Sequence, residues 1–583
     1  MVSPDAALKE NDLPLDIDIW TEVLDQLDAP DISRLSRSSK KAAALVNALG
    51  WPSLAQRYRM HHVTVDLSDE ETPKMSVLKH NFHVAKSLHE RRMLAKQVGQ
   101  NWDKGYIPKI RISKERILVA AGPKLIGYSL QPHRYPHEEI ARRIVTAETT
   151  VWTPQIDSLQ HRSIHQNAYT DLRRRNSHMN GRRTTAYSPL EDITGFCELP
   201  DGQVVTGNVG GVLQRQRFSL DAQTSGETQL AQSTALYPSP SMQQIVEVSG
   251  ALSGTSSLVL SATKDGRASL LRAEAPWIQP SIIDTHTRLW TAHLSIASQP
   301  YAAFGGSGGS SQALQIYPVT PTGILVPEKV QTPFLGSKHA RSAVYGLATP
   351  PKDMSMPYSN NPSSVLLSAW YDSHARLYDL RVSEMASRRP VMEMQDPWSH
   401  EALYCCDFTG NGHIVAGAAR HGMLHIWDPR LIRSPERSSA TRSANVRQDI
   451  QPDAVFASHR GGWTVYTPGQ PNSPVYDVKA EGGRIWGVTN KRTFVLSFDT
   501  QGAAADAVDA KRWDIVSENM TPRHTVHTDQ RTGGRSSAKG SEEARDYATC
   551  YEHGDPLLRP FYSLGADRDR GGTQSRRAMS NWS

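Results

Sequence analysis

Residues 400–428 read HEALYCCDFTGNGHIVAGAARHGMLHIWD, and this stretch decides how the rest of the chain is interpreted. Apolar runs of about five residues are separated by turns rich in Gly, Asn and Asp, a spacing typical of antiparallel β-strands. The run Ile414-Val415-Ala416-Gly417-Ala418 is followed by a turn at Arg420-His421-Gly422 and by a second strand that ends at Trp427-Asp428. The stretch therefore predicts two paired strands closed by a Trp-Asp pair.

The same unit, a small-residue strand, a turn and a strand with a large apolar end, occurs seven times. The terminal residues are Tyr128, Phe218, Leu271, Tyr317, Tyr378, Trp427 and Phe498. Neighbouring terminal residues lie between 46 (317 − 271) and 90 (218 − 128) positions apart. A WD repeat has a period of ~40 to 45 residues, so we expect insertions in the loops.

The unit at 400–428 resembles a WD repeat, and so does the unit that ends in Ala375-Arg376-Leu377-Tyr378-Asp379. The resemblance implies an all-β, seven-bladed WD-repeat propeller over residues 106–499. Closure of such a ring protects strand edges that an open sheet would expose. The outer strand of the last blade is expected from residues 100–106 or 511–516, and the sequence leaves that choice open.

The N-terminal residues 13–60 carry helical rather than strand periodicity. Ile19, Val23, Leu24 and Leu27 share one helix face, and a break at Asp28-Ala29-Pro30 precedes a second helix with Ile32 and Leu35 facing inward. These residues predict a small all-α module. This module buries too little apolar surface to be stable by itself, so we expect it to bind a partner.

Residues 27–40, LDAPDISRLSRSSK, resemble the F-box. That resemblance implies docking onto the Skp-type adaptor of a cullin ubiquitin ligase. The implied adaptor-binding residues are Leu13, Pro14, Ile19, Val23, Leu24, Leu27, Pro30, Ile32 and Leu35. The opening differs from the family pattern, because two extra residues separate Leu13-Pro14 from Ile19. The alternative interpretation is an ordinary three-helix bundle.

Three further regions are assigned by composition. Residues 75–102 are predicted to form a helical linker between the module and the propeller. Residues 158–190 and 430–450 are expected to be exposed or disordered insertions. Residues 500–583 are expected to be a mostly disordered tail, with one short element at 512–515.

Composition and motifs argue against several classes of function. Only four cysteines occur among 583 residues, with no CxxC pair and no histidine at zinc-ligand spacing, so neither a disulfide scaffold nor a metal site is expected. Residues 305–309, GGSGG, lack the Lys-Ser/Thr of a phosphate loop. No cofactor and no catalysis are predicted. A net charge of +6 does not predict nucleic-acid binding. With neither a signal peptide nor a membrane span recognisable, the chain is expected in the cytoplasm or nucleus.

One face of the expected propeller offers candidate binding residues. Counting back from the end of each unit places Lys264, Tyr371 and Arg420 at the turns between second and third strands. The resemblance to WD-repeat substrate receptors implies that basic residues at such turns hold phosphate groups or acidic side chains. The alternative is that all three are solvent-facing turn residues.

The combined resemblance is to the F-box/WD-repeat proteins, with weak Trp-Asp pairs and long insertions similar to the dactylin-like branch. It implies a non-catalytic substrate receptor of a ubiquitin ligase, with an adaptor, a cullin and acidic or phosphorylated protein substrates as partners. The alternative is a non-degradative WD-repeat scaffold in another complex. Co-purification with adaptor and cullin separates the two.

Overall fold

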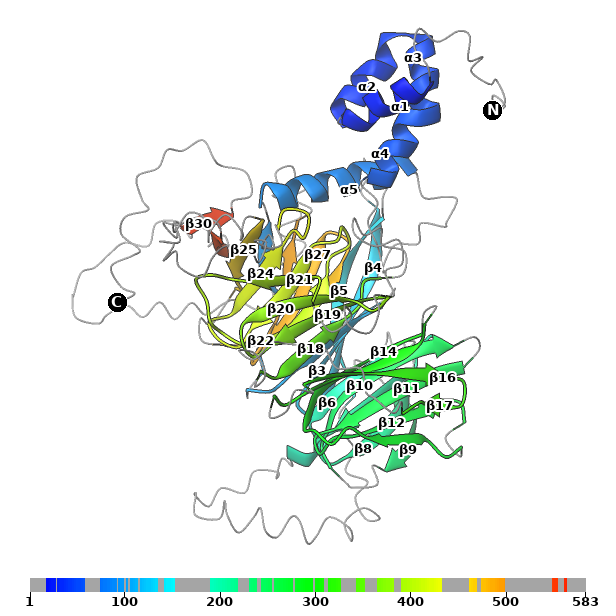
Figure 1. Cartoon of the computed structure of the whole chain (residues 1–583), viewed down its shortest axis with the longest axis vertical. Helices are drawn as coiled ribbons and strands as arrows, with labels where there is room; N and C mark the ends of the chain where they lie inside the picture. The colour runs from blue at the N-terminus through cyan, green and yellow to red at the C-terminus, as the bar shows by residue number, and fades with distance from the viewer. Residues whose placement is uncertain are drawn as a thin grey trace, which may run out of the picture.

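The computed structural model of the chain joins N-terminal helices to a ring of β-sheets (Figure 1). It describes residues 17–57, 74–152, 189–326, 342–432, 461–498, 548–553 and 560–563, with shorter gaps inside these ranges. The predicted loops at 158–190 and 430–450, apart from their edges, and the short element at 512–515 lie outside the described residues.

Short helices pack into the N-terminal module. They are α1 (Ile17–Gln26), α2 (Ala29–Ser38), α3 (Lys40–Leu45), the π-helical turn η2 (Val46–Gly50) and α4 (Trp51–Arg57). Ser39 separates α2 from α3 with an extended backbone, and its hydroxyl accepts a hydrogen bond from the Ala42 N–H at 3.0 Å. This cap satisfies an otherwise unpaired N–H and starts the new helix.

Seven antiparallel sheets of at least four strands follow, and they confirm the predicted propeller. We number the blades in chain order. Blade one has β2 (Lys109–Ile112), β3 (Arg116–Ala121), β4 (Lys124–Arg134) and β5 (Ala141–Trp152); blade two has β6 (Ile193–Glu198), β7 (Val204–Asn208), β8 (Val212–Phe218) and β9 (Leu230–Pro238), after the 3-10 turn η3 (Pro189–Glu191). Blade three has β10 (Ile245–Ser253), β11 (Ser256–Thr263), β12 (Arg267–Arg272) and β13 (Ser281–Asp284); blade four has β14 (Leu289–Ser295), β15 (Tyr301–Gly306), β16 (Leu314–Thr320) and β17 (Gly323–Ile324).

The remaining blades depart from simple chain order. Blade five has β18 (Val344–Ala348), β19 (Val365–Trp370), β20 (His374–Asp379) and β21 (Met392–Gln395). Blade six has β22 (Leu403–Phe408), β23 (Ile414–Ala418), β24 (Met423–Trp427) and β25 (Gly462–Tyr466), extended by β29 (Ala548–Glu552) and β30 (Pro560–Ser563). Blade seven has β26 (Val475–Glu481), β27 (Arg484–Thr489), β28 (Thr493–Ser497) and β1 (Leu94–Val98). The seven units found in the sequence are the second and third strands of these blades.

The ring is closed by β1, which corrects two expectations. Strand β1 pairs with β28 from Leu94↔Ser497 to Val98↔Thr493, so neither 100–106 nor 511–516 supplies the closing strand. The predicted linker helix also ends early: α5 spans Lys74–His89, and the chain turns at Glu90 and Arg91 before entering the sheet. Arg91 has a left-handed backbone with φ of 56°, a conformation incompatible with continuing a helix.

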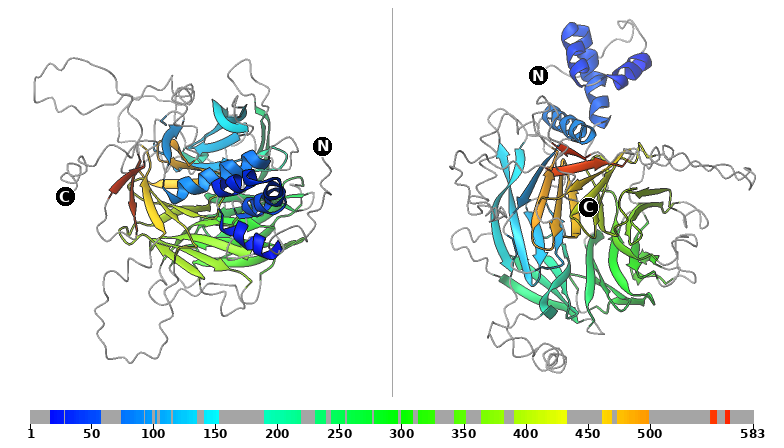
Figure 2. Two further views of the ribbon diagram at one scale, coloured as in Figure 1. Left: turned by 90° about the horizontal axis from the view of Figure 1, so that it is seen from above. Right: turned by 90° about the vertical axis from the view of Figure 1, so that its left-hand side faces the viewer.

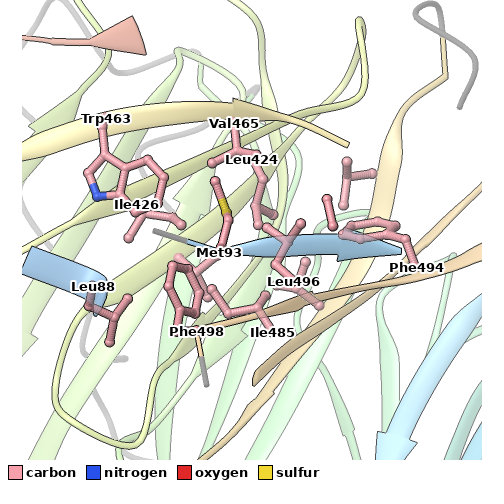
Figure 3. Close-up of a cluster of buried hydrophobic side chains, with 14 of the residues drawn as sticks. Leu88, Met93, Leu424, Ile426, Trp463, Val465, Ile485, Phe494, Leu496 and Phe498 are labelled. Carbon is pink, nitrogen blue, oxygen red and sulfur yellow. The ribbon is translucent and has the colours of Figure 1, made fainter. Parts of the chain in front are cut away.

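Helix α5 packs onto blades six and seven. Val84 and Leu88 on α5 and Met93 just before β1 are buried in a cluster with side chains such as Trp463 and Phe498 (Figure 3). Val84 lies against the turn between β26 and β27, where it leaves no room for a side chain at Gly483. The helix that leads out of the N-terminal module is therefore part of the propeller core.

This contact assigns the two faces of the ring. In an antiparallel blade, the turn between first and second strands lies on one face, and the turn between second and third strands lies on the other. Because α5 contacts the first-to-second turn of blade seven, the N-terminal helices stand on that face (Figures 1 and 2). We call the opposite face, with the second-to-third turns, the turn face.

The predicted disordered tail contains an ordered hairpin. Strand β29 pairs with the outer strand of blade six, Trp463↔Glu552 to Val465↔Cys550, and β30 pairs with β29. Blade six is thus a six-stranded sheet, and the expectation for residues 500–583 is wrong for this hairpin. Within the described part of the chain, no helix has the length and apolar character needed to cross a membrane.

Deleting the closing strand is predicted to unfold the propeller. A chain that begins at residue 74 keeps α5 and β1, so we expect cooperative thermal unfolding close to that of the whole chain. A chain that begins at residue 99 exposes the edge of β28 and the apolar cluster under α5, and should aggregate or lose its cooperative transition. Differential scanning calorimetry of both chains measures the difference, and equal transitions would contradict this role of β1.

Candidate functional site

The N-terminal module has a core that includes two of the predicted docking residues. Leu24 and Ile32 are fully buried beside Leu45, Val46 and Leu54. They hold the helices together and expose no surface in this structure, and their assignment to the docking surface stays a prediction. The sequence could not separate these roles, because core-facing and partner-facing side chains of a short helix are both apolar.

Other predicted docking residues remain accessible. Ile19 and Val23, one turn apart on α1, are 44% and 38% exposed. Pro30 is exposed, and Leu27 and Leu35 are half-buried at the edge of the core. Leu13 and Pro14 lie outside the described residues. The accessible set forms a candidate docking surface, because exposed large apolar side chains beside one another are typical of protein interfaces.

The three predicted substrate-binding residues all lie on the turn face, in the second-to-third turns of blades three, five and six. Lys264 is half-buried and its Nζ donates to Gln244 Oε1 at 3.2 Å. The Arg420 side chain is 72% exposed, with Nε 3.8 Å from Glu401 Oε2. Tyr371 is 59% exposed. Lys264 is thus partly engaged by its own blade, whereas Tyr371 and Arg420 are available to a partner.

Sequence reasoning missed a second set of residues on this face. Trp290, Tyr345, Tyr404 and Tyr476 each occupy the second position of the innermost strand in blades four to seven. Each stands where the register to the next strand shifts by one residue, the mark of a β-bulge. A recurring aliphatic-aromatic pair, Leu-Trp, Val-Tyr, Leu-Tyr and Val-Tyr, opens these strands and would have revealed the set.

These four side chains form a continuous chain of ring contacts, which we call the aromatic row. Ring centroids lie 5.3 Å apart for Trp290 and Tyr345, 5.2 Å for Tyr345 and Tyr404, and 6.0 Å for Tyr404 and Tyr476. Tyr371 continues the row outward, 6.2 Å from Tyr345. All four are half-buried. The row therefore offers apolar ring faces across four blades, on the turn face around the central axis of the ring.

Polar groups border the aromatic row. The Arg288 guanidinium lies 4.1 Å from the Trp290 ring centroid, and Trp290 Nε1 donates to Ser307 Oγ at 3.1 Å. Burial raises the pKa of Tyr345 and of Tyr476, so both phenols stay protonated at neutral pH and can donate hydrogen bonds. Apolar faces with hydroxyl donors and a nearby cation are suited to binding a peptide.

Inside the channel, buried charges tie three blades together. Arg111 of blade one donates to Glu247 Oε1 of blade three and to Asp477 Oδ2 of blade seven, each at 2.9 Å. Lys109 Nζ lies 2.8 Å from Glu247 Oε2. Although burial favours the neutral acid, Arg111, Lys109 and Lys479 hold the pKa of Asp477 below its ordinary value. The network is a structural bridge across the ring.

The cysteines do not support covalent catalysis. Burial raises the pKa of the Cys197 thiol to about 12, and it raises the pKa values of the neighbouring Cys405 and Cys406 as well. A thiol that stays protonated at neutral pH is a poor nucleophile. The side chain of Cys550 lies outside the described residues.

Comparison with known proteins identifies the N-terminal module. The family model described as "F-box domain" matches residues 11–50. An F-box followed by a seven-bladed propeller is the architecture of the F-box/WD-repeat proteins, in which the F-box protein serves in general as a substrate receptor.

Individual known proteins are similar to parts of this chain. F-box/WD repeat-containing protein 4 of Mus musculus is 38% identical over 68 residues, and the protein of that name from Homo sapiens is 39% identical over 66 residues. These matches cover 12% and 11% of this chain and 15% of each relative. Among solved structures, the WD40 β-propeller domain of Doa1 aligns over 68% of this chain and 96% of that chain, with 13% identity and a TM-score of 0.39.

Breaking the channel network is predicted to destabilise the ring. Arg111→Met removes the cation that joins Glu247 to Asp477, while Lys109 stays beside Glu247, and this should lower the free energy of unfolding by about 1 to 3 kcal/mol. Arg267→Met removes a half-exposed arginine of blade three and should change it by less than about 0.5 kcal/mol. Urea unfolding of the two variants measures both values, and a small loss for Arg111→Met would contradict a bridging role.

Proposed function

We propose that the protein is the substrate-recognition subunit of a Skp/cullin/F-box ubiquitin ligase. The observation that carries the proposal is the F-box match at residues 11–50 in a chain that continues into a seven-bladed propeller. The F-box binds the Skp-type adaptor, the adaptor connects to the cullin, and the propeller binds the target protein in the cytoplasm or nucleus.

The proposed mechanism is proximity rather than chemistry. The receptor raises the effective concentration of a target lysine at the ubiquitin-loaded enzyme and needs no catalytic group of its own. The buried, protonated cysteines fit a non-catalytic role. Because α5 is packed into the propeller core, the chain that follows the docking helices is anchored on the face opposite the turn face.

Targets are proposed to bind on the turn face. The aromatic row supplies apolar contact area, and Arg288 and Arg420 favour an acidic or phosphorylated flank. Lys264 contributes less than expected from the sequence, because its ammonium is already hydrogen-bonded to Gln244.

The adaptor-docking proposal is tested by charging the exposed face of α1. Ile19→Glu with Val23→Glu should weaken adaptor binding at least about tenfold, because two apolar contacts are lost and two charges are buried. Ala44→Glu places a glutamate on an exposed position of α3, and this variant should bind the adaptor normally. Calorimetric titration with the purified adaptor measures this. Unchanged affinity in the double variant, or a pulldown that contains another stable complex but neither adaptor nor cullin, would favour the scaffold alternative.

The substrate-binding proposal is tested at the centre of the aromatic row. Tyr404→Ala removes the ring that joins Tyr345 to Tyr476, so we expect at least a tenfold loss of the proteins captured under proteasome inhibition. Tyr466→Ala removes a half-buried tyrosine from the outer strand of blade six and should retain them. Quantitative mass spectrometry of the captured proteins compares the variants. Adaptor binding should be unchanged in both, and equal capture would exclude the aromatic row as the substrate site.

A further inference from the structure

Three buried side chains meet between blade six and the C-terminal hairpin. Asp396 follows β21 on the connection from blade five, His425 lies on β24, and His553 directly follows β29. Each is at most 2% exposed, and one ligand atom from each lies within 4.8 Å of the other two. The sequence did not indicate this cluster, because 29 (425 − 396) and 128 (553 − 425) positions separate its members.

The geometry matches a small transition-metal ion. Asp396 Oδ2 lies 3.3 Å from His425 Nδ1 and 3.4 Å from His553 Nε2. Tetrahedral Zn²⁺ with bonds of about 2.0 to 2.1 Å has ligand atoms about 3.3 to 3.4 Å apart. Thr464 Oγ1 lies 2.7 to 2.9 Å from all three atoms, which is hydrogen-bond distance and shorter than the ligand spacing around zinc, so this hydroxyl borders the site rather than serving as a ligand.

The surroundings prepare these groups for a metal. The second oxygen of Asp396, Oδ1, accepts a hydrogen bond from the Trp398 N–H at 2.9 Å, which aims Oδ2 at the two imidazoles. Such outer hydrogen bonds orient the ligands of protein metal sites. The Trp427 ring flanks both imidazoles, with centroids 5.6 Å from His425 and 5.8 Å from His553. Asp396 Oδ2 thus faces two imidazoles and the Thr464 hydroxyl.

We propose that Asp396, His425 and His553 bind a zinc ion that fastens the C-terminal hairpin to blade six. Two imidazoles and one carboxylate favour Zn²⁺ over Mg²⁺ or Ca²⁺, which prefer oxygen ligands. The site joins three separate parts of the chain: the connection from blade five, the third strand of blade six, and the hairpin β29–β30. Ordering of residues 548–553 on the ring therefore depends on the metal.

The first test measures the metal content of the full chain. Protein exposed to excess Zn²⁺ and then dialysed should retain about one equivalent by inductively coupled plasma mass spectrometry. His553→Asn should retain zinc at least about 100-fold more weakly. His413→Asn is the matched control, since it removes a buried histidine of the same blade. His413 lies 3.7 Å from the Asp428 carboxylate and does not belong to the group of Asp396, His425 and His553. It should retain zinc like the unaltered chain.

A second variant separates a metal site from a network of hydrogen bonds. Thr464→Val removes the hydroxyl that contacts all three side chains, but keeps the carboxylate and both imidazoles. We expect zinc affinity within about tenfold of the original, and zinc-dependent hydrogen-exchange protection of residues 548–552. Gly462→Ala should weaken zinc binding without removing a ligand, because a Cβ at that position collides with the His553 ring.

Two outcomes overturn the proposal. If the unaltered chain retains no zinc after loading, the cluster is a hydrogen-bonded network with one protonated imidazole. The same conclusion follows if His553→Asn retains as much zinc as His413→Asn. Because the first outcome is measured on the unaltered chain, it remains decisive even if a variant fails to fold.

Discussion

The pairing of β1 with β28 is the constraint on which the rest of the molecule depends. It closes the ring with a strand that comes from before the first blade, so the two ends of the propeller cannot separate without breaking the pairing. The same short stretch leads directly out of α5, whose Val84 and Leu88 are buried against blades six and seven. The strand that closes the ring and the helix that precedes it are therefore held by one continuous stretch of chain, Lys74–Val98.

The inner strands show how one structural element serves both stability and binding. In blades two to seven the register shifts beside the second residue of the innermost strand, and in blades four to seven that residue is aromatic. The bulge turns these rings toward one another at the turn face. Deeper in the channel, the same strands contribute Glu247 and Asp477 to the ion network with Arg111. The aromatic rings thus lie at the turn face and the paired charges lie deeper, because a desolvated charge must be paired whereas an aromatic ring can stay half-exposed.

The number and order of the blades could be predicted from sequence, because the second and third strands of a blade are buried and keep their small-residue and terminal apolar pattern. The closing strand could not be predicted. Its sequence, Leu94-Ala95-Lys96-Gln97-Val98, is short and follows directly on a helical pattern, so local periodicity assigns it to the helix. The sequence identified Leu24 and Ile32 as apolar positions of the helical module but could not predict that both lie in its core. The cluster of Asp396, His425 and His553 could not be predicted from the sequence for another reason, since its members meet only after the distant hairpin β29–β30 has joined blade six.

The contact of α5 with the propeller also bears on where the two proposed binding surfaces lie. Helix α5 occupies the face with the first-to-second turns, as the contact of Val84 with Gly483 requires. A partner of α1 to α4 is thereby kept on that side, and the aromatic row at the other mouth of the channel stays open. A flexible linker would let the two bound partners sample many separations, and the effective concentration of one at the other would fall as the accessible volume grows. Because α5 is buried, its own distance from the turn face is set by the thickness of the propeller, so an alteration at Val84 or Leu88 should shift α5 even if both proposed binding surfaces remain intact.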